Sequence, residues 1–168
     1  MMLVRGTKKF LDRVGSPEPG EHVAAGLLGD WYASALFWRP QTALFVNERS
    51  LVPVLLPLAP AATVLDRFPA AFAHVAAAIG VDRAVLDAEL ATMQTHTLAK
   101  TASRQILGVM NDFAHLAEHH RLQHHEVDLV DLSLRLARVP CSPLYKSHIS
   151  PDRALQALLG QPADTVRP

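Results

Sequence analysis

A helix predicted from Thr101 to Arg121 carries polar side chains that could bind a ligand. Arg104, Gly108 and Asn111 are spaced by three or four residues, so they share one face of that helix. The guanidinium of Arg104 would bind an anion, and the carboxylate of Asp112 would act as a base. Because Gly108 has no side chain, it leaves a gap that admits a ligand or another backbone. The alternative is structural: Arg104 and Asp112 form ion pairs, and Asn111 holds a loop.

Three polar residues next to predicted strands could belong to the same site. Asp30 precedes a strand, and Asn47 and Glu48 form a tight turn after another. Their structural roles would be to accept backbone N–H bonds and to tolerate the backbone angles of the turn. If the Gly108 face points toward this turn, Glu48 becomes an alternative base. The candidate catalytic residues are then Glu48, Arg104 and Asp112, and the candidate ligand-binding residues are Asp30, Asn47, Glu48, Arg104 and Asn111.

The same helix carries an apolar stripe that predicts how it packs. The members of the stripe recur at spacings of three and four residues and are Ile106, Met110, Phe113 and Ala117. We expect this stripe to face a sheet and to be buried, which would make the helix the organising element of the domain.

A histidine-rich tract at the end of this helix contains a metalloprotease-like pattern. His115, Glu118 and His119 spell H-x-x-E-H, in which two histidines of one helix face bind zinc. Five of the nine histidines fall in this region, so the pattern arises easily by chance. Such an enzyme also needs a distant third ligand and more chain than the 49 residues after His119. We therefore expect a solvated helix end, with adventitious metal binding at His115 and His119 at most, and no cofactor.

Cys141 is the only cysteine, so neither an intrachain disulfide nor a thiolate zinc cage can form. A nucleophilic pair with His148 lacks an orienting third group, and a lone cysteine is usually a small buried hydrophobe. A reduced thiol and the lack of a signal-peptide pattern favour the cytoplasm. The longest apolar run, Leu51 to Leu65, is too short for a bilayer and is interrupted by prolines, so no membrane span is expected.

Charge and aromatic content give no strong sign of nucleic-acid binding. Sixteen basic residues offset sixteen acidic ones, so the chain has no net charge to attract a polyanion. The aromatic residues between Trp31 and Phe45 could form a stacking platform, but aromatics on adjacent strands usually belong to the core.

The hydrophobic pattern divides the chain into a strand-rich first part and a helical second part. Strands are predicted at Trp31 to Trp38, Thr42 to Val46 and Leu51 to Leu56. The short connections between them require antiparallel neighbours, and Leu3 with Val4 could add an edge strand. These strands predict a small antiparallel β-meander of three or four strands.

Helical patterns dominate the chain from about residue 63 onward. About five helices are predicted, and strands followed by helices without alternation indicate an α+β fold. We expect the helices to pack on one face of the meander. Residues 1–160 should form a single domain, and residues 161–168 a flexible tail.

Four segments resemble, in this order and spacing, an uncharacterised bacterial family that is a domain of unknown function. They are LGDWYA (28–33), LFVNERSL (44–51), KTASRQILGVMNDF (100–113) and RVPCSPL (138–144). The resemblance covers roughly residues 2–160 and implies a bacterial, intracellular, single-domain protein with no assigned activity. It also marks the family-type polar positions of this chain, which are Asp30, Trp31, Asn47, Glu48, Arg104, Asn111 and Asp112.

The leading interpretation is a small cytoplasmic binding or interaction module that recognises a protein partner or a polar ligand at the junction of sheet and helix. One alternative is a hydrolase or transferase acting on a phosphate-bearing substrate, with Arg104 as anion clamp and Glu48 or Asp112 as base. Another is a component of a toxin–antitoxin or defence pair, which rests on size alone. A module should bury these polar groups in mutual pairs, whereas an enzyme should gather them in a concave pocket. The sequence leaves both classes open and indicates no oligomeric state.

Overall fold

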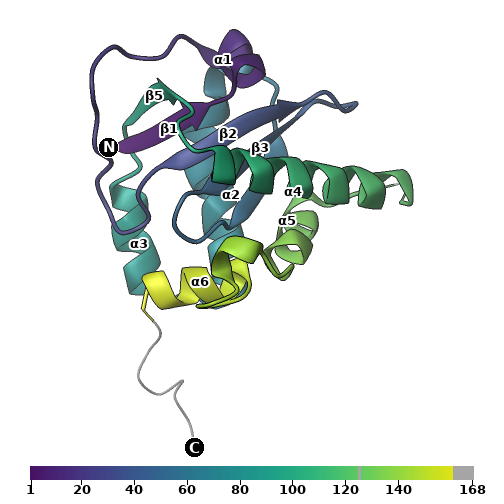
Figure 1. Cartoon of the computed structure of the whole chain (residues 1–168). Helices are drawn as coiled ribbons and strands as arrows, with labels where there is room; N and C mark the ends of the chain where they lie inside the picture. Colours follow the sequence, from purple (N-terminus) through teal and green to yellow (C-terminus); the bar gives the residue numbers. More distant parts are fainter. Residues whose placement is uncertain (125, 161–168) are drawn as a thin grey trace, which may run out of the picture.

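The three predicted strands form an antiparallel meander, and two further strands extend it into a five-stranded mixed sheet (Figure 1). The computed structural model describes residues 1–124 and 126–160, so the predicted tail over 161–168 lies outside the described residues. The strand order is β4-β3-β2-β1-β5. The strands are β1 (Met2–Gly6), β2 (Trp31–Leu36), β3 (Thr42–Asn47), β4 (Pro53–Pro57) and β5 (His96–Lys100).

The prediction of a purely antiparallel sheet is wrong at β1 and β5. β1 lies inside the sheet and pairs in parallel with both β2 and β5. Parallel neighbours need long crossover connections, and short-range turn signals do not reveal such pairings. β5 was not predicted, because only Leu98 among its five residues is buried and the apolar alternation is correspondingly weak.

Six α-helices lie within the described residues, and they cover both faces of the sheet instead of the single face that was predicted (Figure 1). α1 and α2 pack on one face and α4 packs on the other, whereas α5 lies along the β4 edge and contributes residues to the clusters on both faces. The reason is that every residue of β2 and β3 is buried, so both faces of these strands need cover. No helix in this part of the chain has the length and apolar character to cross a membrane. The helices are α1 (Lys8–Val14), α2 (Val64–Ile79), α3 (Arg83–Ala91), α4 (Arg104–Leu122), α5 (Leu129–Ala137) and α6 (Pro151–Leu158), with single 3-10 turns η1 (Ala61–Thr63) and η2 (Ser142–Leu144).

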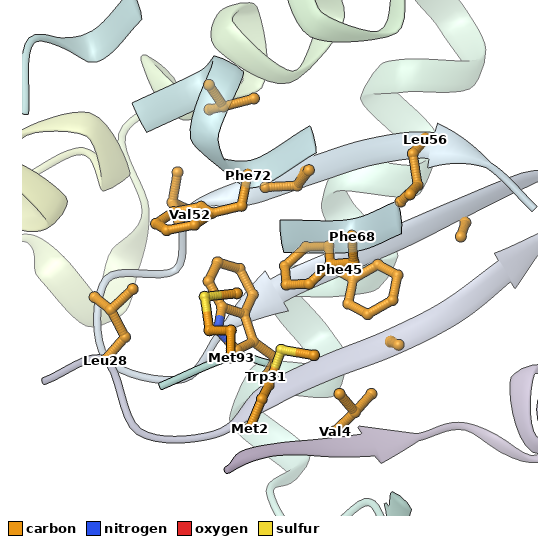
Figure 2. Close-up of a cluster of buried hydrophobic side chains, with 14 of the residues drawn as sticks. Met2, Val4, Leu28, Trp31, Phe45, Val52, Leu56, Phe68, Phe72 and Met93 are labelled. Carbon is orange, nitrogen blue, oxygen red and sulfur yellow. The ribbon is translucent and has the colours of Figure 1, made fainter. Parts of the chain in front are cut away.

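Aromatic side chains fill the α2 face of the sheet (Figure 2). The ring of Trp31 lies edge-on to the rings of Phe68 and Phe72, with centroids 4.8 and 5.1 Å away. Phe45 stacks on Phe68 with centroids 4.0 Å apart. Trp31 and Phe45 are therefore core residues, as the sequence predicted, and neither ring lies on the sheet surface to stack on a nucleic acid.

α4 covers the opposite face with the predicted apolar stripe. Ser103 caps the helix, because its side-chain oxygen accepts a hydrogen bond from the Ile106 N–H over 3.2 Å. All four residues of the stripe are buried, and Phe113 is only 1% exposed. The predicted burial of the stripe against the sheet is confirmed.

α5 lies along the free β4 edge of the sheet, and the chain that follows α5 runs back toward α4. The Leu55 N–H of edge strand β4 donates to the Ser133 hydroxyl of α5 over 2.9 Å, so this N–H is satisfied without another strand. Leu132 and Leu136 pack among the residues beneath α4. The segment that follows α5 is thereby held beside α4.

Candidate functional site: a cleft beside helix α4

Asn47 has a structural role, because its side chain is fully buried and fully bonded. Its amide nitrogen donates to the carbonyl oxygens of Leu28 (2.8 Å) and Asp30 (3.3 Å). Its side-chain oxygen accepts hydrogen bonds from the backbone N–H groups of Arg49 and Ser50 and from the Ser50 hydroxyl. These bonds tie the turn after β3 to the start of β2, as the structural alternative anticipated.

Asp30 and Glu48 lie beside Asn47 and form part of the same structural cluster. The Arg5 guanidinium lies 2.8 Å from the Asp30 carboxylate, a contact that raises the pKa of Arg5. The Asp30 N–H donates to the Glu48 carboxylate over 2.9 Å. Gly29 has a φ of +69°, and a Cβ there would meet this carboxylate, so the close approach requires glycine. Of the five predicted ligand-binding residues, the structure brings together Asp30, Asn47 and Glu48.

The prediction that Gly108 leaves a gap for a ligand or another backbone is wrong. Arg104, Gly108 and Asn111 are all exposed, and a Cβ added at Gly108 would meet nothing within 4 Å. Successive helix residues are rotated by about 100°, so Gly108 points about 200° away from Ile106 of the buried stripe. The face with Arg104 and Asn111 therefore looks into solvent and not toward the turn that carries Glu48.

The H-x-x-E-H residues have other partners. Glu118 forms an ion pair with Arg121 at 2.8 Å, and the Arg121 guanidinium lies 5.1 Å from the ring centroid of Trp38. The His119 ring lies within hydrogen-bond distance of the Gln123 amide, at 3.2 Å. No three metal-ligating side chains gather anywhere in residues 1–124 and 126–160.

Among the three candidate catalytic residues, Asp112 lines a cavity. A cleft of about 410 Å³ lies between α4 and the segment 139–145, and we call it the α4 cleft. The segment begins at Val139, two residues after the end of α5, and its Cys141 N–H donates to the Ile149 carbonyl oxygen over 2.9 Å. The α4 cleft is lined from α4 by Val109, Asp112, Phe113, His115 and Leu116, and from the segment by Val139, Pro140, Cys141, Ser142, Pro143 and Tyr145.

The chemistry of the α4 cleft is that of an apolar site with one carboxylate. Asp112 is the only acidic residue in the lining, and no lysine or arginine lines it. Leu116 and Tyr145 at its walls are 44% and 60% exposed, so apolar surface is accessible to a ligand. The sequence analysis named Asp112 but missed Val109 and Leu116, which extend the apolar stripe of α4 on the side of the cleft.

Cys141 lies in the α4 cleft as a neutral thiol. Burial and, to a lesser degree, the negative charge of Asp112 raise the pKa of Cys141 to about 11. Its thiol donates weakly to the Val139 carbonyl oxygen over 3.5 Å. His148, the partner considered from sequence, does not line the cleft. The geometry therefore gives Cys141 none of the activation that a nucleophilic thiol requires.

A second cleft, of about 520 Å³, lies where the sheet meets α1. Gly6 and Lys100, at the carboxyl ends of the parallel strands β1 and β5, line it together with Lys8. Ligands of parallel sheets often bind at such ends. Lys8, however, is 89% exposed and already paired with Asp12 at 2.9 Å. This cleft has weaker binding chemistry than the α4 cleft.

Residues 3–154 match the family described as Domain of unknown function (DUF6933), so the chain belongs to that family. The predicted resemblance to an uncharacterised family is confirmed. Searches among curated proteins and among solved structures gave no match. Two of the four segments that carry the resemblance line the α4 cleft: KTASRQILGVMNDF contributes Val109, Asp112 and Phe113, and RVPCSPL contributes residues 139–143.

Proposed function

We propose that this member of the DUF6933 family is a small binding module that holds its ligand in the α4 cleft. The observation that carries the proposal is the convergence of two family-type segments, 100–113 and 138–144, on one cavity. Its volume of about 410 Å³ falls within the range of small-molecule sites. Mostly apolar walls with a few polar groups, here Asp112, His115 and Ser142, are also the usual composition of such sites.

The side-chain chemistry favours binding over the hydrolase or transferase alternative. That alternative needs Arg104 at one site with Glu48 or Asp112. Arg104 and Asp112 are eight residues apart on α4, which separates them by about 12 Å along the helix axis. Glu48 instead holds the Asp30 N–H. The neutral thiol of Cys141 adds no nucleophile.

We propose that the protein acts in the cytoplasm, where its single cysteine would stay reduced. The ligand we favour is a small molecule, and not the protein partner that the sequence left equally open, because the α4 cleft is concave and of small-molecule volume. A role in a toxin–antitoxin or defence pair gains no support from the geometry of the cleft.

The test is a fragment screen by two-dimensional ¹⁵N–¹H NMR on the full chain. We expect fragments to shift the amide signals of Val109, Leu116 and Ser142 together. Leu116→Ser, which removes an apolar wall, should weaken those fragments at least about fivefold, the cost of losing a small part of an apolar contact. The matched control is Leu122→Ser, because Leu122 is exposed on the same helix but does not line the cleft. The proposal is wrong if the fragments that bind leave these signals unmoved, or if Leu116→Ser and Leu122→Ser weaken fragment binding equally.

A further inference from the structure

The charges around the α4 cleft are unbalanced. Asp112 lines the cleft as its only carboxylate; His115 also lines it, and no lysine or arginine does. Within residues 1–124 and 126–160, no cationic side chain lies within ion-pair distance of Asp112. The negative charge of Asp112 also contributes to the raised pKa of Cys141, which lies in the same cleft. The field of this carboxylate therefore acts inside the cavity, where a bound cation would meet it.

The walls of the cleft complement a hydrocarbon that carries such a cation. Val109, Leu116, Val139 and Pro143 supply aliphatic surface. Tyr145 adds an exposed aromatic ring, whose face attracts an ammonium group. A purely polar ligand would leave these walls unused, and an anion would meet the charge of Asp112.

From this arrangement we infer that the α4 cleft binds a small primary amine with an apolar body, whose ammonium group pairs with Asp112. The inference rests on the proposed function and names its ligand class. The occupant is a free small molecule, because a cavity of about 410 Å³ is of small-ligand size. A stable protein partner would instead cover about 800 Å² on each side.

The experiment titrates the full chain at neutral pH with three phenyl-bearing probes of similar size: benzylamine, benzyl alcohol and benzoate. Amide shifts of Val109, Leu116 and Ser142 report the site and the dissociation constants. We expect benzylamine to bind about fivefold more tightly than benzyl alcohol, the contribution of one partly exposed ion pair, and benzoate to bind most weakly. Asp112→Asn should remove the advantage of benzylamine and leave benzyl alcohol unchanged. Asp112 is exposed, so this variant should keep its fold.

Asp131→Asn is the matched control, because Asp131 is an exposed helical aspartate outside the α4 cleft. Its binding of all three probes should equal that of the unaltered protein. N-acetyl-lysine methylamide serves as a fourth probe, which represents a lysine side chain of a partner protein. Tighter binding of this probe than of benzylamine would assign the cleft to a protein segment and overturn the inference.

The remaining outcomes separate the two proposals. Equal binding of benzylamine and benzyl alcohol in the cleft would overturn the amine inference and leave the binding module standing. An advantage of benzylamine that survives Asp112→Asn would also overturn it. If neither the three phenyl-bearing probes nor the fragment screen moves signals of the cleft, both proposals are wrong.

Discussion

Truncating Phe113 to alanine tests whether α4 is anchored to the sheet through its buried stripe. The ring is 1% exposed and belongs to the cluster that also contains Leu44 and Val46 of β3. Replacing a fully buried phenylalanine by alanine costs about 3–5 kcal/mol. We expect a loss of about 3 kcal/mol, at the low end of that range, because Phe113 also lines the α4 cleft. The space left by the ring would merge with the cleft and would not form a closed void.

Urea unfolding followed by circular dichroism measures this loss. With a denaturant dependence of about 2 kcal/mol per molar, the midpoint should fall by about 1.5 M. Leu116→Ala is the control, because Leu116 lies one turn further along α4 but is 44% exposed, and its change should stay within about 0.5 kcal/mol. A loss below about 1 kcal/mol for Phe113→Ala, or an equal loss for both variants, would refute the anchoring role of the stripe.

Three further predictions follow from single residues. Glu89 is 5% exposed and accepts hydrogen bonds from the N–H groups of Leu27 and Leu28. Glu89→Ala should therefore lower the free energy of unfolding in urea by about 2–3 kcal/mol and speed hydrogen exchange at the Leu28 amide. An unchanged exchange rate at Leu28 would contradict this prediction. Gly108→Ala should raise the free energy of unfolding by about 0.5–1 kcal/mol, since the exposed helical glycine meets nothing within 4 Å, and a loss of stability would show that the site is constrained after all. Because the pKa of Cys141 is raised from its ordinary 9.0 to about 11, its alkylation by iodoacetamide should rise about tenfold per pH unit up to pH 10. An alkylation rate that levels off near pH 9 would contradict the raised pKa. The neutral thiol's contribution to folding stability is complete below about pH 9 and is lost as the pH rises toward 11, because the unfolded chain releases the thiol proton at lower pH than the folded chain.

The parts of the fold that were predictable are those with local signals. The turns between β2, β3 and β4 are short and carry turn residues, so neighbours in sequence became neighbours in the sheet. The stripe of α4 repeats at helical spacing, and it is buried. The pairing of β1 with β5 joins residues 2–6 to residues 96–100, and no local pattern encodes a contact over that separation. The cover on both faces of the sheet depends on that same long-range topology.

The candidate site divides in the same way, and the helix geometry explains why Asp112 lines the α4 cleft while Arg104 and Asn111 do not. At about 100° per residue, Asp112 lies about 240° around α4 from Ile106, and Leu116 lies about 280° around it. These two residues flank the buried stripe, whereas Gly108, at about 200°, lies opposite to it. Val109 and Leu116 extend the apolar stripe on this flank, so the flank could have been found from the sequence. Leu107 and Ala114 extend the stripe on its other side, where both pack against the core. The opposing wall could not, because the segment 139–145 is held there by bonds between distant residues: the Leu55 N–H donates to Ser133 of α5, and the chain that leaves α5 turns back against α4. A helix flank is a property of spacing, but a cleft needs a second wall, and tertiary contacts alone decide which segment supplies it.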